Sequence, residues 1–285
     1  MRRQRRLARD LWFRFLIYVA AVVALLPLSL VLAYTISNGW RAAMQPDFYL
    51  HFERPEGIPG AGVQHAIVGT LELVGMASLL AIPVGIVVGT HLAEYRQHRW
   101  ATWVRLAGDV LVGTPSIAIG LFAYALLVAP FHHFSALSGA GALAVLMLPV
   151  VMRTTEGALL LVPVGLREAG LALGLPRWRV ALQLMLRAAA PGVVTGALLA
   201  VARAAGETAP LLFTSFGNRR LVFNPAEPMQ ALPLTVFHNA LTPYKDLEDQ
   251  AWGAALLLVV LVLIVNLASR FALRRQLALA GRGTS

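Results

Sequence analysis

The chain has 285 residues, of which 58% are hydrophobic and 13% are charged, and its mean hydropathy is +0.68. A soluble domain carries about 25% charged residues, so this composition excludes an ordinary soluble protein and indicates a membrane protein. The sequence contains no cysteine, which excludes disulfides and thiolate metal ligands.

Six apolar stretches approach or exceed the ~20 residues that a helix needs to cross a bilayer. In chain order they lie at about 13–36, 65–92, 103–128, 139–161, 191–216 and 251–271. The first follows an arginine cluster, as in a signal peptide, but it is too long and has no small-residue cleavage site before Asn38. We expect it to be a retained anchor. The sequence therefore predicts an all-α, polytopic membrane protein with about six transmembrane helices.

The fourth stretch differs from the others because charged residues enter its second half. Its apolar part ends near Met152, and Arg153 and Glu156 follow before an apolar triplet resumes at Leu159. We expect this helix to leave the bilayer and to continue into the cytoplasm.

The net charge of +10 would suit a nucleic-acid-binding protein, but the positions of the charges argue against one. If the N-terminus is cytoplasmic and six spans alternate, the cytoplasmic segments carry 18 Lys and Arg residues and the outer segments carry 5. This excess follows the positive-inside rule. We expect a multi-pass protein of the cell (inner) membrane, surrounded by lipid, with both termini in the cytoplasm and no nucleic-acid partner. The outer loops would be 37–64, 129–139 and 217–250.

Between the fourth and fifth spans, residues of about 163–190 predict two short amphipathic helices, which we call the elbow. Gly174 and Pro176 should end the first helix, with Gly174 in a conformation that a side chain would strain. Pro191 should end the second helix and admit the fifth span. From the residues alone, the elbow either lies flat in the lipid interface or docks into a groove of a soluble partner.

Arg203 and Glu207 lie within a hydrophobic run from Val193 to Phe216. On a helix, residues four apart lie on one face, so the two side chains should meet. A charge near the bilayer centre costs roughly 2.5–3.5 kcal/mol on insertion scales, so charged residues there usually serve a function. An arginine favours an anion. Two interpretations remain open at this point: an ion pair that pins two helices together, and a polar path for an anion.

The elbow resembles the Glu-Ala-Ala-x-x-x-Gly signature of the permeases of binding-protein-dependent ABC importers. Glu168, Ala169 and Gly174 match the signature, Gly170 replaces its second alanine, and Arg187 stands where the family has proline. The resemblance implies the type I ABC importer permease fold. It also implies that the elbow is the coupling helix seated on an ATPase subunit, through Glu168, Ala169 and Gly174.

Further motifs between about Ile67 and Arg270 resemble the phosphate permeases PstA and PstC. They include Thr114-Pro115-Ser116, Met152-Arg153-Thr154-Thr155-Glu156 and the Arg-Ala-x-Gly-Glu-Thr segment that ends at Thr208. The Ala-Pro-Leu-Leu that follows resembles PstA more than PstC. On this resemblance we expect the translocation path to include Arg153, Arg203, Glu207 and Thr208.

The chain has no G-x-x-x-x-G-K-[ST] phosphate loop, so we expect no cofactor on it and no catalytic activity. The family implies two PstB-like ATPase subunits that hold ATP and Mg, a PstC-like permease that forms a heterodimer with this chain, and a PstS-like phosphate-binding protein. Permeases for molybdate, tungstate or sulfate share the elbow and are the alternative within transporters. An intramembrane enzyme is the alternative from another class, although His132-His133 lacks the ligand spacing of a metal site.

These expectations divide the chain into three parts. Residues 1–64 hold an N-terminal cytoplasmic tail, the first transmembrane helix and an outer loop. Residues 65–271 form the type-1 permease domain with its elbow, and residues 272–285 form a cytoplasmic tail.

Overall fold

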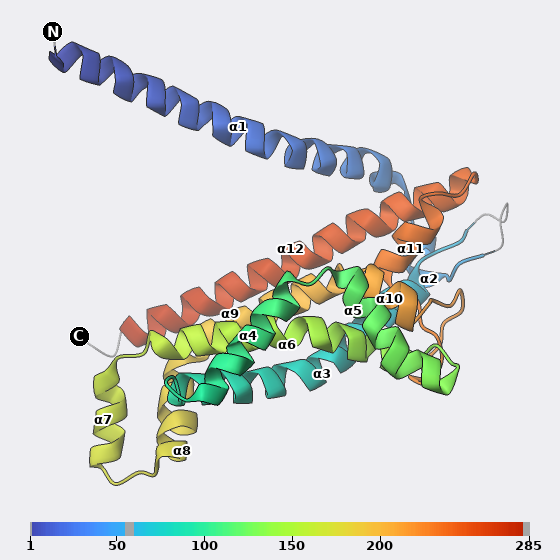
Figure 1. Ribbon diagram of the computed structural model, residues 1–285. Helices are drawn as coiled ribbons and strands as arrows, with labels where there is room; N and C mark the ends of the chain where they lie inside the picture. Colours follow the sequence, from blue (N-terminus) through green and yellow to red (C-terminus); the bar gives the residue numbers. More distant parts are fainter. Residues whose placement is uncertain (1, 55–59, 282–285) are drawn as a thin grey trace.

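The computed structural model describes residues 2–54 and 60–281, and in these ranges the chain forms helices and no strand (Figure 1). The all-α prediction is therefore confirmed. The helices are α1 (Arg2–Ala43), α2 (Pro46–Leu50), α3 (Gln64–Glu94), α4 (Arg99–Gly113), α5 (Ser116–Ala123), α6 (Ala136–Leu160), α7 (Val164–Ala172), α8 (Arg177–Arg179), α9 (Leu186–Ala205), α10 (Ala209–Thr214), α11 (Leu232–Asn239) and α12 (Lys245–Gly281). Short π turns at Tyr124–Val128 and Val180–Met185 and a 3-10 turn at Ala129–Phe131 complete the order.

Five of the described helices are long and apolar enough to cross a membrane, and a sixth span results if one bent helix pair is counted. That pair replaces the continuous third span predicted at 103–128. It consists of Arg99–Gly113 and Ser116–Phe131, which meet at an angle of 107°. The break follows from Pro115, which has no N–H to donate and disfavours helical backbone at the preceding residue. Thr114 accordingly has an extended ψ of 133°.

The fifth span also differs from its prediction, at both ends. The helix runs from Arg177 through the π turn and α9 to Ala205, with Pro191 inside it. Pro191 therefore does not separate the elbow from the span, contrary to the expectation. A proline removes only one backbone hydrogen bond, and the close packing of neighbouring helices keeps a membrane helix continuous across it. Here Gly192 lies so near Ala158 of α6 that a Cβ would overlap it.

The core lies where α3, α6 and α9 pack together, and small residues permit the close approach. Gly89 on α3 lies against Thr155 on α6, and Gly196 on α9 lies against Thr154 on the same helix. Large buried side chains fill the remaining space, among them Leu143 and Met147 of α6. Helix α6 is therefore the central element of the bundle, with 61% of its apolar stretch buried, against none for α1.

The close approach at Gly196 yields a testable prediction. A side chain at this position would overlap Thr154, so Gly196→Leu should destabilise the protein by about 1–3 kcal/mol through overpacking. Thermal unfolding in detergent measures the effect. Gly157→Leu is the matched control, because Gly157 of α6 has no atom within 4 Å of its Cβ position. Equal melting temperatures for the two variants would contradict the close packing of α6 and α9.

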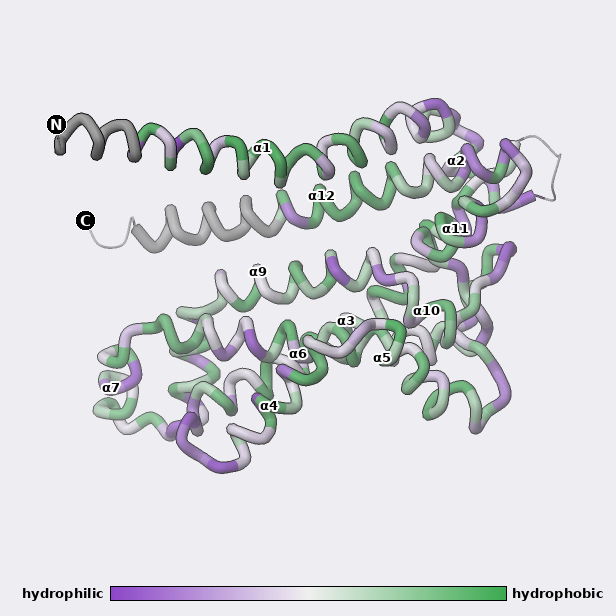
Figure 2. Tube along the Cα trace, turned by 45° about the horizontal axis from the view of Figure 1, so that its top comes forward, coloured by the Kyte–Doolittle hydropathy of each residue, from purple (hydrophilic) through white to green (hydrophobic). Residues whose placement is uncertain are grey.

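Helix α1 leaves the bundle over most of its length and approaches α12 near its end (Figures 1 and 2). There Tyr34 meets Trp252 of α12 in an edge-to-face contact with ring centroids 5.1 Å apart. Residues 10–31 of α1 are exposed, and most are apolar. Helix α12 extends to Gly281, so the predicted C-terminal tail of 272–285 is helical through 281, and residues 282–285 lie outside the described residues.

Helices α7 and α8 form a hairpin at one end of the bundle and run across the direction of the long helices (Figure 1). Gly174 has a φ of +77°, which confirms the expected left-handed conformation at the end of the first elbow helix. The hairpin is closed by Gly170, whose Cα lies against Val180 and Leu184 and whose carbonyl accepts from the Leu175 N–H at 3.3 Å. A Cβ at Gly170 would lie 2.6 Å from the end of the Leu184 side chain, so the alanine of the signature would require Leu184 to shift.

Candidate translocation site and coupling elbow

The Arg203–Glu207 pair lies in a break between two helices and not on one continuous helix as predicted. Helix α9 ends at Ala205, and Glu207 follows in a turn in which its N–H donates to the Ala204 carbonyl at 3.2 Å. The two side chains still meet, with Arg203 Nε 3.4 Å from Glu207 Oε1. The Arg203 side chain is 43% exposed and that of Glu207 is 16% exposed. The pair is therefore long, and its arginine is the more exposed partner.

The sequence after Arg203 explains the break. Gly206 is a weak helix former at the C-cap of α9, and Pro210 occupies the first turn of α10, where a proline is tolerated. Thr208 lies between them as the N-cap residue of α10, half-buried, and its carbonyl accepts from the Leu212 N–H at 3.1 Å. Irregular backbone at membrane depth is tolerated where it is buried in protein or lines a cavity.

The two broken spans meet each other. Helix α10 packs on α5, and the contact is close because Gly120 of α5 lies against Pro210, where a Cβ would overlap. The break at Thr114-Pro115 thus leads into α5, and the break at Gly206-Glu207-Thr208 leads into α10. These two short helices contact each other. Discontinuous helices that meet in this way are a common construction of transporter sites.

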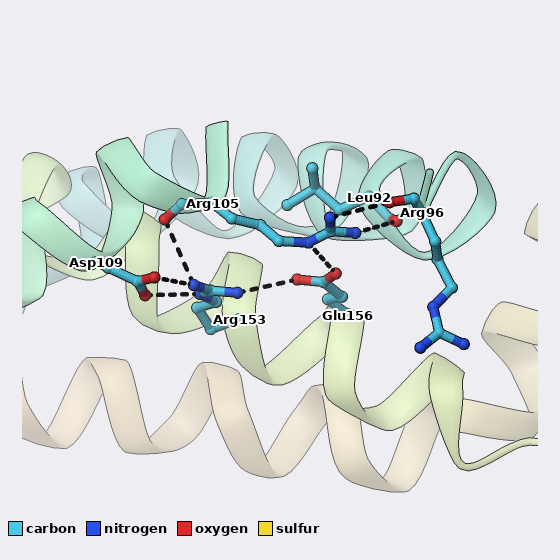
Figure 3. Close-up of polar contacts among 6 residues, drawn as sticks. All are labelled: Leu92, Arg96, Arg105, Asp109, Arg153 and Glu156. Carbon is cyan, nitrogen blue, oxygen red and sulfur yellow. Dashed lines mark hydrogen bonds and ion pairs between the residues drawn. The ribbon is translucent and has the colours of Figure 1, made fainter. Parts of the chain in front are cut away.

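Arg153 belongs to a second charged group, which also contains Asp109 and Glu156 (Figure 3). From α6 it donates to both carboxylate oxygens of Asp109 on α4, with the bond from Nε to Oδ1 at 3.0 Å. Its Nη1 lies 3.4 Å from Oε2 of Glu156, whose side chain is 7% exposed. Because Glu156 is nearly buried, a negative charge on it would be costly without such partners.

Arg105 completes this group and was not predicted as a functional residue. Its Nε donates to Glu156 Oε1 at 2.7 Å. Its other nitrogens donate to the carbonyls of Leu92 at 2.9 Å and Arg96 at 3.1 Å, at the end of α3 (Figure 3). The sequence contained a signal for this group. Arg105 and Asp109 lie four apart on α4, and Arg153 and Glu156 lie three apart on α6. Each helix therefore presents one positive and one negative side chain, and each can pair with the opposite charge on the other helix.

The four predicted path residues therefore form two groups. At the level of Thr154, beside Arg153, α6 packs against Gly196 of α9. Arg203 lies seven residues farther along α9, which corresponds to about 10 Å of helix. Arg203, Glu207 and Thr208 lie together at the break, while Arg153 pairs with Asp109 and Glu156 nearer the elbow. Whether any of them contacts a translocated anion stays a prediction.

The predicted coupling residues Glu168, Ala169 and Gly174 are all exposed on the hairpin. The neighbouring Arg167 instead turns inward and forms an ion pair with Glu94 at the end of α3. The hairpin is thus attached to the bundle through Arg167 and presents the three signature residues at its surface.

Comparison with known proteins identifies the chain. Residues 81–278 match the family of binding-protein-dependent transport system inner membrane components. The chain belongs to this family. The chain is also 42% identical to the phosphate transport system permease protein PstA of Haemophilus influenzae, over 89% of each chain. It is 44% identical to PstA of Yersinia pestis over 76% of this chain and 74% of that one. It is 39% identical to PstA 1 of Mycobacterium tuberculosis (strain H37Rv) over 88% and 83%.

A solved structure shares the fold of this chain. An inward-facing conformation of the MetNI methionine ABC transporter superposes with a TM-score of 0.62 at 19% identity, covering 75% of this chain and 96% of that chain. The likeness confirms the predicted type I ABC importer permease fold. The chain is therefore a multi-pass membrane protein and a non-catalytic subunit of a transport system.

Proposed function

We propose that this chain is the PstA-type permease subunit of an ATP-driven importer of inorganic phosphate, and that it forms half of the translocation path. The observation that carries the proposal is the Arg203–Glu207 pair at a break in a membrane span, in a chain 39–44% identical to permeases named for phosphate transport. Molybdate, tungstate or sulfate transport is not favoured by these relatives.

The pair suits a transient phosphate site. Arg203 is partly exposed, so a phosphate anion can replace Glu207 as its partner. An arginine left unpaired in a low-dielectric environment would be costly, and Glu207 supplies a neutralising partner when the path is empty. Once the anion is bound, the same carboxylate repels it and favours its departure. The pair therefore alternates between an internal bridge and an anion site as the helices move.

Energy for uphill transport comes from other subunits in this proposal. Two PstB-like ATPases hold ATP and Mg and receive the elbow, a PstC-like permease supplies the other half of the path, and a PstS-like protein delivers phosphate. The exposed Glu168, Ala169 and Gly174 are the contact surface for the ATPase. In this proposal the elbow and both termini lie in the cytoplasm, and the complex lies in the inner membrane.

Reconstitution tests the proposed function. The chain would be co-purified with its candidate partner permease, ATPase and binding protein and incorporated into proteoliposomes. We expect ATP-dependent uptake of phosphate, no uptake of sulfate or molybdate, and no activity for this chain alone. Uptake of another oxyanion in place of phosphate would contradict the substrate. Activity of the isolated chain would contradict the assignment as a permease subunit.

The proposed orientation yields a separate prediction. Because the chain has no cysteine, single cysteines can be introduced without a background signal. In intact cells, an impermeant thiol reagent should label Ala226→Cys, in the loop between α10 and α11, and should not label Trp178→Cys in the elbow. Both positions are exposed, so burial does not explain a difference between them. Labelling of position 178 before the cells are opened would reverse the proposed topology.

A further inference from the structure

Helix α11 and the loop that follows α10 lie at the end of the bundle opposite the elbow (Figure 1). A cavity is lined by these elements and by Glu53. Its volume is about 340 Å³, within the ~300–1,000 Å³ typical of small-molecule sites. Side chains that line it include Glu53, Arg219, Gln230, His238 and Asn239. None of these residues entered the predicted translocation path.

Glu53 is the charged centre of this cavity. Its side chain is only 3% exposed, and Oε1 lies 3.2 Å from Nε of Arg219. Its Oε2 lies 3.8 Å from Nε2 of His65, which is also buried. The Arg219 side chain is 66% exposed. A guanidinium has five N–H donors, and in the described part of the chain Arg219 uses only its Nε toward Glu53, so further donors are available at the mouth.

Two buried amides in the same cavity wall have polar atoms without partners. Gln230 and Asn239 are each 3% exposed, and neither Gln230 Oε1 nor Asn239 Nδ2 has a hydrogen-bond partner among the described residues. Native proteins rarely leave such groups unsatisfied, and an unpaired buried group calls for a ligand or ordered water. Both residues line the cavity, although these two atoms are themselves covered by the surrounding protein.

His238 adds a neutral group to the wall. Burial lowers the pKa of its imidazole, the positive charge of Arg219 lowers it further, and the carboxylate of Glu53 partly opposes this shift. The ring is therefore largely neutral near pH 7, with one nitrogen that donates and one that accepts.

The arrangement of donors and acceptors selects among oxyanions. Inorganic phosphate at neutral pH has deprotonated oxygens, which accept hydrogen bonds. It also has at least one P–OH group, which donates a hydrogen bond. Arg219 supplies donors at the mouth of the cavity, while the Glu53 carboxylate supplies acceptors in its wall. Sulfate at neutral pH has no proton to donate, so the Glu53 carboxylate would face its oxygens with like charge and no hydrogen bond.

The cavity is joined to the Arg203–Glu207 break by one short helix. Helix α10 begins two residues after Glu207 and ends at Thr214, directly before the cavity loop. That loop turns sharply, with positive φ at Phe216 (61°) and Gly217 (94°), and Gly217 lies so close to Gln230 that a side chain would overlap Gln230 Oε1. The two sites are thus the two ends of α10.

We propose that this cavity is an entry site for inorganic phosphate, in which Arg219 binds a deprotonated oxygen and the Glu53 carboxylate accepts a hydrogen bond from the P–OH group. The inference rests on the proposed function and adds a binding step before the Arg203–Glu207 pair. Glu53 makes the site selective for a protonated oxyanion, independently of the selectivity of the binding protein.

Equilibrium dialysis with radiolabelled inorganic phosphate tests the site. The sample is the purified complex of the permease and ATPase subunits, without the binding protein. An Arg203→Gln background removes the second anion site from the measurement. In that background Arg219→Gln should weaken phosphate binding by about tenfold or more, because it removes a charge-assisted contact. The control is Arg220→Gln, which removes an adjacent exposed arginine outside the cavity lining and should change binding less than twofold. Equal binding by the two variants would overturn the proposal.

Glu53→Gln tests the selectivity. In the Arg203→Gln background, sulfate should not displace labelled phosphate. It should displace phosphate once Glu53→Gln is added, because the amide no longer repels a fully deprotonated anion. Equal resistance to sulfate in a folded Glu53→Gln variant would refute the role of the carboxylate. Should that buried substitution prevent folding, the exposed Arg219 still decides the proposal. Failure of the parent complex to take up phosphate contradicts the proposed function, whereas normal uptake with equal binding by Arg219→Gln and Arg220→Gln contradicts only the cavity.

Discussion

Arg203→Gln and Glu207→Gln should each lower phosphate uptake by roughly 10–100-fold in the reconstituted transporter. Arg203→Gln removes the charge that attracts the anion, and a hydrogen bond to a charged group contributes about 1.5–3 kcal/mol. Glu207→Gln leaves Arg203 without a neutralising partner, so that the anion binds but departs slowly. Initial rates of uptake, normalised to the amount of assembled complex, measure both effects.

The Asp10–Arg14 pair on α1 offers a matched control. It has the same spacing of four residues and a distance of 3.0 Å, but it lies on an exposed part of the helix, away from the break. Arg14→Gln should leave uptake within twofold of the parent, because exposed pairs contribute little. If Arg203→Gln and Glu207→Gln instead impair assembly, and the assembled fraction transports normally, the pair is only a structural clamp between α9 and α10.

Gly174→Val should uncouple ATP hydrolysis from transport, with a loss of uptake of tenfold or more. Gly174 has a φ of +77°, which a β-branched residue adopts only at a cost of about 1–3 kcal/mol. The turn would rearrange to relieve this strain and would displace Glu168 and Ala169 from the ATPase groove. Hydrolysis stimulated by the binding protein and phosphate, measured beside uptake, reports the coupling.

Two controls separate backbone strain from the added side chain. Gly174→Asn should retain most of the coupling, because asparagine tolerates the left-handed conformation. Gly165→Val adds the same bulk to the same hairpin, at a helical residue whose Cβ position has no atom within 4 Å, and should also transport. Normal coupling in Gly174→Val, or equal loss in all three variants, would contradict the conformational role of Gly174.

The sequence by itself was sufficient for the class of protein and most of its helices. Composition and the lengths of the apolar stretches predicted an all-α membrane protein, and the structure confirms this with five candidate spans and a sixth that is bent. These features are local, because crossing a bilayer requires a minimum apolar length and a helix satisfies its own backbone. The left-handed Gly174 was likewise predictable, since glycine at a helix end has few alternatives.

Only the tertiary structure decided where the spans break and which charges meet. Pro115 and Pro191 both lie in apolar runs, yet the chain bends by 107° after the first and continues as a helix through the second. A proline disfavours helical backbone at the preceding residue in either case, and at Pro191 the close packing of α9 on α6 keeps the helix continuous. Likewise, Arg153 was grouped with Arg203 by motif, but its partners Asp109 and Glu156 are set by the docking of α4 on α6. Ion pairs between distant segments depend on that packing, which no local pattern specifies.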